Sequence, residues 1–435
     1  MLRRTLWIAR VLVAGLAGWP LRLLRRGLGK PPRIWHGIKP LHSYPAAVKA
    51  DRVAGFPSLS VVMQPRQDGK YQLTSDVDFD VVAERLGYRW DEQHWACLCH
   101  LLRHGDIWST SFQPFFPMDH SRANEAVFRL LRLVGIKVIV FPFGTDVAYR
   151  DPYRDRYDWV GRLQEDYPQW DLVTWGATTR ARVALYSRYA ALVVGNDSSI
   201  SRFLVRNDLH FKSYPVDTDS LRPADRPSSS PPVILHATNH RRVKGTDVLQ
   251  RSVEELRSAG IACDLRLVEH VDRLEAYRLY SEADIIADQF VMGAYGVFAL
   301  EALALGKPVL TFLDCQHLGN PVFNLPLVHT THENMTRVLA ALVLCPELRT
   351  RLGRLSRAQV VEYQSIEALA EVWKQIYEHV WWSRPLHLES TRHFSPKRTA
   401  RSFSEDPTDP CFWPVPVADL LPAIENAVRV VSSAR

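Results

Sequence analysis

Cysteine is scarce in this sequence, and its spacing offers no framework for disulfide bonds. The chain has six cysteines in 435 residues, and they are scattered: Cys97, Cys99, Cys263, Cys315, Cys345 and Cys411. A disulfide-stabilised secreted domain is therefore not indicated, and the composition suits a reducing compartment. The chain also lacks internal repeats and heptad runs, which excludes solenoids and long coiled coils.

A general excess of charge is also missing. Lys and Arg number 54 against 47 Asp and Glu, and the seven basic residues among the first thirty account for the whole difference. A sequence pI of about 9.1 favours anionic partners such as nucleotides or phospholipid surfaces. Because the rest of the chain is electrically balanced, nucleic acid is not an expected partner.

The first thirty residues have basic ends and an apolar middle, MLRRTLWIARVLVAGLAGWPLRLLRRGLGK. Three interpretations compete: a signal peptide, a helix in the membrane plane, and a first helix packed on the protein. Arg10 and Pro20 interrupt the apolar run and make it too short to span a membrane. The sequence favours an in-plane helix over residues 1–29, with arginines among anionic headgroups and leucines in the acyl boundary. On a helical wheel the residues opposite the arginines are Leu6, Leu12, Val13, Leu16, Leu23 and Leu24, while Trp7, Val11 and Leu21 fall among the arginines.

Short β-branched runs alternate with helical stretches along the chain, which is the pattern of an α/β protein. In the first half the runs are LSVVMQP, DIWSTSFQP, KVIVFPFG and AALVVGND. A Pro- and Ser-rich break, Arg222 to Pro232, separates the halves as a linker would. The second half repeats the alternation through VILHAT, CDLRLVE, DIIADQF and KPVLTFL. At about 150 residues per domain, two main domains are expected.

Such units predict parallel sheets, whose ligands bind beyond the carboxyl ends of the strands. The functional loops should therefore be NHRRVKG, EHVDR, DQFVMGAYG and DCQHLGNP. In the first of these, Arg241, Arg242 and Lys244 lie just before a helix and suit a diphosphate, although a solvated basic turn has the same composition. Asp288 and Gln289 end a strand and either accept hydroxyl hydrogen bonds or form a turn.

A single carboxylate, Glu301, lies in the otherwise apolar stretch MGAYGVFALEALALGKPVL. Its neighbours leave almost no polar helix face, which argues against a solvated position. A carboxylate there can accept two hydrogen bonds from a ribose or a hexose. The glycines before it allow the backbone to approach a ligand closely. The remaining candidate binding residues of this loop and of EHVDR are Gly293, Ala294, Tyr295, Gly296, Glu269 and His270.

The second half, from about residue 200 to 382, resembles the nucleotide-sugar domain of the retaining GT-B glycosyltransferases of family 4. The resemblance rests on RFLVRNDLHFKSYPVDTDSLRP, RVKGTDVL, YSEADIIADQF and GAYGVFALEALALGKPVL. It implies a GT-B fold, with two Rossmann-like domains facing across a cleft. By this resemblance Lys244 would hold the donor diphosphate, and Glu301 would be the second glutamate of a Glu-x7-Glu pair, bonding the ribose. The implied division is 30–215 for the acceptor, 216–382 for the nucleotide sugar, and 383–435 as a peripheral tail.

Two positions depart from the family pattern. Gly293 stands where the first glutamate of the pair would be, eight residues before Glu301. Asn239 stands where an arginine usually precedes the phosphate lysine. One of the two arginines that follow it would have to supply the missing cation, and the Asp-Gln pair at the preceding strand end would compensate for the missing carboxylate.

The first half matches the family less distinctly. Its FPFGTDVAYRD stretch resembles the glycine-plus-aspartate loop beside the donor and makes Gly144, Thr145 and Asp146 candidates. Asp146, together with Lys244 and Glu301, completes the expected catalytic set. The alternative is an ordinary strand-to-helix turn with an aspartate cap.

Two further clusters imitate metal sites. The span HWACLCHLLRH brings together His94, Cys97, Cys99, His100 and His104, but a buried helix explains its composition more simply. The segments DVDFD and DTD, at 76–80 and 217–219, imitate the metal-binding Asp-x-Asp of the other glycosyltransferase fold. With basic side chains available for the diphosphate, no metal is expected, and no cofactor beyond the donor substrate.

The sequence thus predicts a metal-independent transferase that moves a sugar, with retention, from a UDP- or GDP-linked donor. A lipid-linked or other glycan acceptor is expected, in the synthesis of a cell-surface polysaccharide or a glycolipid. The protein would work peripherally at the cytoplasmic face of an anionic membrane. Two alternatives stay open: a sugar-nucleotide epimerase of the same fold, and a non-catalytic GT-B subunit that binds glycan or serves as a scaffold.

Overall fold

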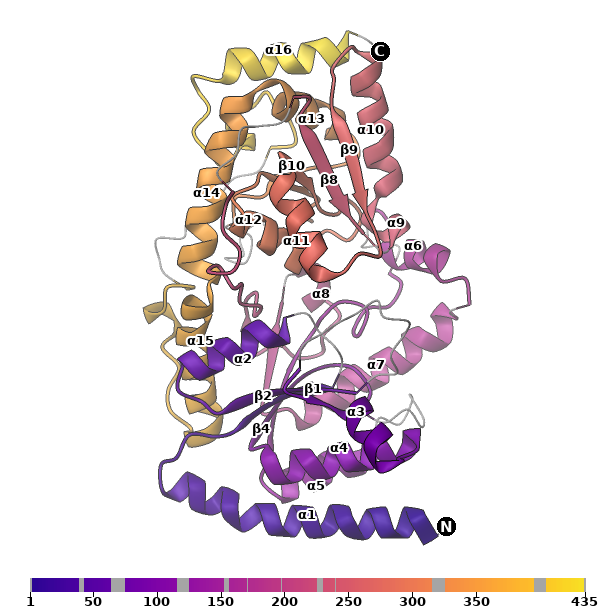
Figure 1. Cartoon of the computed structure of the whole chain (residues 1–435), viewed down its shortest axis with the longest axis vertical. Coiled ribbons are helices and arrows are strands. Elements are labelled where there is room, and N and C mark those ends of the chain that lie inside the picture. Colours follow the sequence, from indigo (N-terminus) through magenta and orange to yellow (C-terminus); the bar gives the residue numbers. More distant parts are fainter. Residues whose placement is uncertain are drawn as a thin grey trace.

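Two parallel sheets form the framework of the chain, one above the other in Figure 1. They come from a computed structural model that describes residues 2–38, 43–63, 75–115, 125–151, 156–169, 171–196, 198–224, 230–238, 240–314, 325–394 and 404–433. The predicted α/β class is confirmed, and all eight β-branched runs quoted above form strands.

The first sheet contains seven strands in the order β3-β2-β1-β4-β5-β6-β7. Strands β1 and β4 are buried along their whole length, as expected for parallel strands covered by helices on both faces. The strands are β1 Ile34–Ile38, β2 Ser58–Val62, β3 Val77–Asp78, β4 Ile107–Ser111, β5 Lys137–Phe141, β6 Leu192–Gly195 and β7 Leu209–His210. The helices of this half are α1 Leu2–Gly27, α2 Tyr44–Val53, α3 Phe79–Leu86, α4 Trp90–His104, α5 Glu125–Leu133, α6 Trp159–Asp166, α7 Leu172–Tyr189 and α8 Ser198–Ser201.

The second sheet contains five strands in the order β12-β11-β10-β8-β9. Its central strand β10 pairs in parallel with both β8 and β11, so the loops after these three strands emerge side by side. The strands are β8 Val233–Ala237, β9 Asp264–Val268, β10 Ile285–Ala287, β11 Val309–Thr311 and β12 Val328–His329. The helices are α9 Arg241–Lys244, α10 Thr246–Ser258, α11 Arg273–Glu282, α12 Val297–Ala304, α13 Met335–Leu344, α14 Pro346–Gln364, α15 Ile366–Trp382, and α16 Leu421–Ser432 with the short η4 Leu388–Ser390 and η5 Pro410–Phe412 before it.

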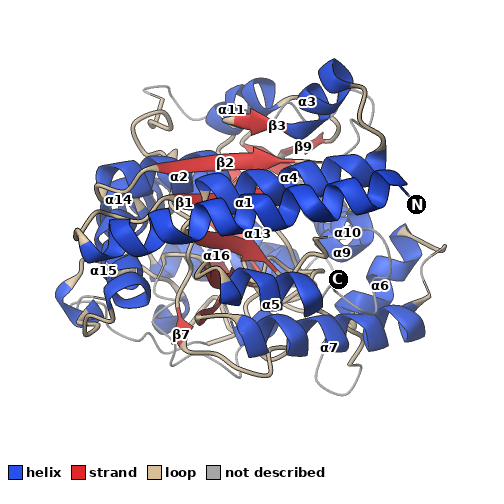
Figure 2. Cartoon of the chain, turned by 90° about the horizontal axis from the view of Figure 1, so that it is seen from below, coloured by secondary structure: helices blue, strands red, loops and turns tan. Residues whose placement is uncertain are grey.

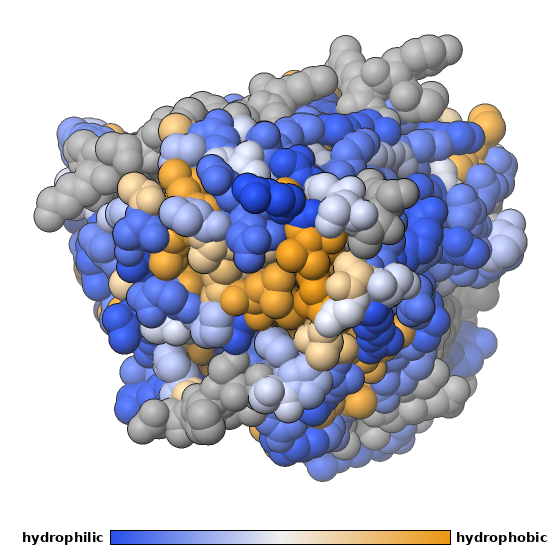
Figure 3. All heavy atoms as spheres, turned by 90° about the horizontal axis from the view of Figure 1, so that it is seen from above, coloured by the Kyte–Doolittle hydropathy of each residue, from blue (hydrophilic) through white to orange (hydrophobic). Residues whose placement is uncertain are grey.

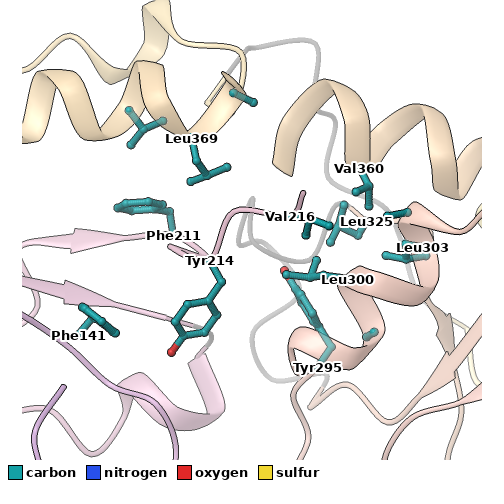
Figure 4. Close-up of a cluster of buried hydrophobic side chains, with 14 of the residues drawn as sticks. Phe141, Phe211, Tyr214, Val216, Tyr295, Leu300, Leu303, Leu325, Val360 and Leu369 are labelled. Carbon is teal, nitrogen blue, oxygen red and sulfur yellow. The ribbon is translucent and has the colours of Figure 1, made fainter. Parts of the chain in front are cut away.

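One hydrophobic cluster joins the two halves. In Figure 4, Phe141 of β5 and Tyr214 of the connecting segment lie on one side, and Tyr295 and Leu300 lie on the other. Helix α15 also returns to the first half and packs against α2. The division at 215/216 therefore stays a prediction about the chain, because packing runs continuously across it.

The end of the chain packs on the second sheet. Helix α16 lies against α13, and Phe412 and Trp413 are buried in the same hydrophobic cluster as the inner residues of α10. Thus much of the tail expected to be peripheral belongs to the packed body. Figure 3 shows this end of the molecule from above, where hydrophobic residues gather in a patch surrounded by hydrophilic ones.

Helix α1 runs across the opposite end of the molecule, beside α4 (Figures 1 and 2). Its inner face consists of Trp7, Val11 and Ala14, which are buried in the cluster that lies under the first sheet. Arg22 is buried as well and donates hydrogen bonds to the carbonyl oxygens of Leu102, at 2.7 Å, and Val134, at 2.8 Å. The expected arrangement, with this side of the helix among headgroups, is wrong for Arg22, because that guanidinium is used inside the protein.

The outer face of α1 is a row of exposed apolar side chains. By length and apolar composition, Thr5–Gly27 is a candidate membrane span in the described chain, so on that measure the expectation of a run too short to span is wrong. Pro20 lies inside the helix without ending it. The exposed residues of α1 are Leu6, Ile8, Leu12, Val13, Leu16, Trp19, Leu21, Leu23 and Leu24, and Leu28 follows the helix; each is at least 43% exposed.

Candidate functional site

The loops expected to bind a ligand lie between the two sheets. The arrowheads of β8 and β9 point toward the first half in Figure 1, and α9, which follows β8, packs against α6 of the first half. The predicted residues of the second half are therefore collected at the carboxyl edge of the second sheet, where parallel sheets bind ligands.

Lys244 and Asp288 form the central ion pair of this edge. The Lys244 ammonium lies 2.7 Å from Asp288 Oδ1. The Asp288 carboxylate is fully buried, and its second oxygen accepts a bond of 3.4 Å from the Gly296 N–H at the start of α12. This pair connects the loops after β8 and β10, so two residues expected to bind the donor are also partners of each other.

The two arginines after β8 are paired with carboxylates from different directions. Arg241 forms a two-pronged pair with Glu269, with N–O distances of 2.8 and 2.6 Å. Hydrogen bonding from Arg241 lowers the pKa of Glu269. The guanidinium of Arg242 lies 3.6 Å from Glu165 of α6. His270, the neighbour of Glu269, has a positive φ of 55°, which marks a tight bend after β9.

Glu301 is buried on α12 but does not lack partners. Its Oε1 atom accepts from the Tyr277 hydroxyl at 2.7 Å and from Arg273 at 3.0 Å. Burial raises the pKa of Glu301, and the charge of Arg273 and the hydrogen bonds from both partners oppose that rise. Every hydrogen bond to this carboxylate in the described chain ends on Oε1. Neither partner was singled out from the sequence, although Arg273 lies in the EHVDR loop.

Gly293 is required by the local backbone. Its φ is +76°, and a Cβ placed on it would lie 2.9 Å from the Cβ of Asp314. The Asp314 N–H also donates to the Gly293 carbonyl at 2.9 Å. Asp314 therefore occupies the space that a side chain at position 293 would need. Asp314 follows β11 and is the first residue of the DCQHLGNP loop, which the strand pattern predicts to be functional, although Asp314 itself was not singled out from the sequence.

Two side chains outside the glycine loop donate hydrogen bonds to its backbone and hold it in place. The Gln289 side-chain amide donates to the Ala294 carbonyl. Lys212, buried in the segment that connects the halves, donates to the Tyr295 carbonyl at 2.6 Å and lies 4.5 Å from the centre of the Tyr295 ring. Lys212 lies within the RFLVRNDLHFKSYP stretch of the family resemblance, but it was not expected at the site.

Helix α6 of the first half contacts the basic loop after β8. The Asp166 carboxylate accepts from the backbone N–H groups of Arg242 and Val243 at 3.5 and 3.4 Å. The Tyr167 hydroxyl lies 2.8 Å from His240 Nδ1. Burial lowers the pKa of His240. These acidic and phenolic groups carried no signal in the sequence, because nothing in it indicates that α6 crosses to the second half.

A second contact between the halves lies just before α6. The Tyr157 ring stacks on His332 with a centroid distance of 3.7 Å, and its hydroxyl donates to Glu333 at 3.0 Å. Arg156 pairs with Glu333 and with Glu405 of the tail. The segment that enters α6 is therefore attached to the second half by an aromatic stack and by charge pairs.

Asp146 forms the hydrogen bonds of a turn-forming aspartate, which is the alternative given above to a ligand contact. Its carboxylate is buried and accepts from the backbone N–H groups of Phe112, Phe143 and Gly144, at 3.0, 2.9 and 2.7 Å. Burial raises its pKa, and these bonds oppose the rise. Thr145 lies in the same turn and is partly buried. The turn is thus held by its own aspartate.

Two groups of earlier candidates are placed elsewhere. Asn239 lies outside the described residues. The His/Cys span forms α4, where Cys97 is buried and His100 Nδ1 accepts from the Trp35 indole at 3.0 Å. No group of three or more His, Cys, Asp or Glu side chains in the described chain is arranged to hold a metal ion.

Comparison with known proteins supports the architecture. No protein-family profile and no curated protein matches the sequence. Among solved structures, the sucrose-phosphate synthase of Thermosynechococcus elongatus matches with a TM-score of 0.51 at 14% identity. The HepE protein of Anabaena, solved in complex with UDP-glucose, matches with a TM-score of 0.50 at 12% identity. Each match covers 81% of this chain and the whole of the other. The fold of this chain is therefore the GT-B fold of glycosyltransferases.

Proposed function

We propose that the protein transfers a sugar, with retention, from a nucleotide-diphosphate sugar to a glycan acceptor. The observation that carries the proposal is the link between the Lys244 cation and the helix that holds Glu301: Lys244 pairs with Asp288, which also accepts from the N–H of Gly296 at the start of α12. In this proposal Lys244, assisted by Arg241 and Arg242, binds the diphosphate, and Glu301 Oε2 accepts a ribose hydroxyl. The UDP-glucose in the HepE structure supports a uridine diphosphate donor.

The proposed reaction breaks the bond between the sugar anomeric carbon and a diphosphate oxygen. The acceptor hydroxyl attacks from the same face, and its proton passes to the departing diphosphate oxygen. The transition state resembles an oxocarbenium ion, so the negative charge gathers on the leaving group. Lys244 is placed to stabilise that charge, and losing one such donor typically costs a few kcal/mol of barrier. To bind the diphosphate, the Lys244 ammonium would have to contact it and Asp288 at the same time, or break its ion pair with Asp288.

Asp314 takes the sugar-orienting role in this proposal. Its Cβ fills the space beside Gly293, at the position where the family resemblance expects a carboxylate. A carboxylate accepts two hydroxyl hydrogen bonds from a sugar. Asp314→Asn should leave UDP affinity unchanged and remove the preference for UDP-sugar over UDP. Gly293→Glu should not restore a missing function, because the backbone there has a positive φ and no room for a side chain.

A panel of nucleotide sugars labelled in the sugar tests the reaction class. Incubation with acceptor extracts should give labelled glycan, and chelator should leave the rate unchanged because side-chain cations carry the charge stabilisation. Release of an epimerised nucleotide sugar would identify an epimerase instead. Binding of glycan with no turnover of any donor would identify a non-catalytic subunit.

We also propose that the protein works peripherally at the cytoplasmic face of a membrane, on a lipid-linked acceptor. The support is the exposed leucine face of α1, which lies at the end of the molecule away from the second sheet (Figure 1). Helix α1 is packed on α4 through Trp7 and Val11, so it lies along the protein and offers its other side to an acyl boundary. Nucleotide sugars are made in the cytoplasm, which places the donor on the same side.

A further inference from the structure

Three basic residues from different elements lie near the end of α1, beside its exposed leucines. Arg26 belongs to the last turn of α1, Arg132 to the last turn of α5, and Lys137 begins β5. Burial lowers the pKa of Lys137, and the charges of Arg26 and Arg132 lower it further. Backbone contacts bring the three segments together: the Lys137 N–H donates to the Asp106 carbonyl at 3.0 Å, and the Asp106 carboxylate pairs at 3.3 Å with Arg25, the neighbour of Arg26. Arg132 lies on the other side of the short turn that leads into Lys137. We name them the basic corner.

The basic corner is built on a fixed turn. Residues Val134 to Ile136 connect α5 to β5, and the buried Arg22 guanidinium holds this turn through the Val134 carbonyl at 2.8 Å. Burial lowers the pKa of Arg22 to about 10, which leaves it charged at neutral pH. A Cβ on Gly135 would lie 4.0 Å from the Trp19 ring, so the turn also lies against α1. The positions of Arg132 and Lys137, which flank the turn, follow from this packing.

The basic corner lacks compensating carboxylates. In the described part of the chain, no ion pair within 4.0 Å involves Arg26, Arg132 or Lys137. The Arg26 guanidinium lies 6.0 Å from the centre of the Trp381 ring. The adjacent acidic residue is Asp106, just before β4, whose carbonyl accepts from the Lys137 N–H; its buried carboxylate is already paired with Arg25 at 3.3 Å and with Arg33 at 2.8 Å. Three adjacent like charges without a carboxylate repel one another, and a bound anion relieves that repulsion.

Apolar side chains surround the same corner. Leu133 lies between Arg132 and the Arg22-held turn and is 77% exposed, and Leu23 and Leu24 of the outer face of α1 are 54% and 59% exposed. Apolar neighbours contribute nothing to the binding of a free inorganic anion. A phospholipid does, because its phosphate can lie on the cations while its chains cover the leucines.

We propose that the basic corner binds the phosphate of an anionic phospholipid headgroup. This inference rests on the proposed membrane location and refines it: the apolar face of α1 supplies binding to any bilayer, and the basic corner supplies the preference for acidic lipid. The corner also fixes the orientation of the protein, because it anchors one end of α1 together with the start of β5.

Vesicle flotation of the full-length protein tests this proposal. The variant Arg132→Gln/Lys137→Gln should bind phosphatidylcholine vesicles like the wild type. Its additional affinity for vesicles containing phosphatidylglycerol should fall about 25-fold, at about fivefold for each basic residue near a charged surface. Arg354→Gln/Arg429→Gln removes two exposed charges from the second half and serves as the matched control, with no expected change. Thermal unfolding of all variants checks that folding is preserved.

The possible outcomes are distinguishable. If the wild type floats with neither kind of vesicle, the membrane location itself is wrong. If the wild type prefers acidic vesicles but the basic-corner variant does so equally, the location stands and the headgroup site is refuted. If inorganic phosphate at constant ionic strength competes fully and binds alone with equal affinity, the corner is a phosphate site and the lipid assignment is refuted.

Discussion

The two proposed functional surfaces of this molecule differ in how their charged side chains are paired. At the edge between the sheets, Lys244, Arg241 and Glu301 are each paired with another side chain of the protein. At the α1 end, the leucines are exposed to solvent, and the basic corner has no carboxylate partner in the described chain. A ligand at the first surface must exchange protein partners for its own groups. A lipid at the second would meet cations that have no carboxylate partner in the described chain, so its binding would break no ion pair of the protein.

The largest expected effect separates the chemistry from the membrane surface. Glu301→Gln should abolish transfer in the labelled-donor assay, because it removes the charged acceptor for the ribose at almost unchanged volume. Flotation with vesicles should be unaffected. Glu275→Gln changes a partly exposed glutamate of α11 that also pairs with an arginine; it is the control and should retain activity. Normal turnover by the Glu301 variant would remove this residue from the site.

The converse prediction concerns the exposed leucines of α1, whose loss should weaken membrane binding and leave nucleotide binding unchanged. Leu12→Ser/Leu16→Ser removes two exposed side chains from one face of α1 and should weaken vesicle binding at least tenfold, at about 1.5–3 kcal/mol for each large apolar side chain fully buried. UDP affinity should not change. Leu274→Ser/Leu344→Ser removes exposed leucines from the second half as the control. These substitutions are preferable to deletion of residues 1–29, which would also strip Trp7, Val11 and Arg22 from the packed core.

A smaller effect concerns pH. Burial raises the pKa of Glu301 and the Arg273 charge opposes that rise. Transfer requires the ionised carboxylate, so the rate should fall as the pH drops through this raised value. Arg273→Gln removes the opposing charge, and the acid limb of the pH–rate profile should therefore move to higher pH. A profile shifted to lower pH, or unshifted, would show that Arg273 does not control Glu301.

The smallest expected effect tests whether α6 competes with the ligand. Glu165→Gln/Asp166→Asn removes two carboxylates that face Arg242 and the backbone beside it. Exposed pairs of this kind are worth up to about 1 kcal/mol, so UDP affinity should rise by a factor of about two to five. Glu254→Gln, on the neighbouring α10, is a charge control. Unchanged affinity in titration calorimetry would mean that the α6 carboxylates do not oppose the nucleotide.

The sequence predicted the parts of this structure that depend on local pattern. Alternating runs gave the strands, and the helical wheel placed Leu12 and Leu16 on the outer face of α1. It did not show that Arg22 is turned inward, because its acceptors are carbonyl groups at the ends of α4 and α5, far along the chain. The same limit applies to Glu301, whose lone position was evident but whose partners depend on how α11 packs.

The family resemblance failed to identify Asp314 for a related reason. A motif search compares residues at fixed spacing, and Gly293 occupies the expected position with a backbone that has no room for a side chain. The neighbouring carboxylate, Asp314, follows the next strand in a loop that the strand pattern did predict to be functional, but it has no fixed spacing to the motif. Asp146 shows the opposite case, where the motif was present but its carboxylate is taken up by its own turn.

Titration calorimetry of UDP against the Lys244→Ala/Asp288→Asn variant tests the central claim most directly. The double change removes the proposed phosphate cation without leaving a buried carboxylate unpaired. Lys374→Ala, which removes a lysine paired with Glu378 on α15, is the control. We expect UDP binding to weaken by about 1.5 to 3 kcal/mol, the range for hydrogen bonds to charged groups, with the control unchanged. Equal UDP affinity for the variant and the wild type would contradict the assignment of this edge as the nucleotide site.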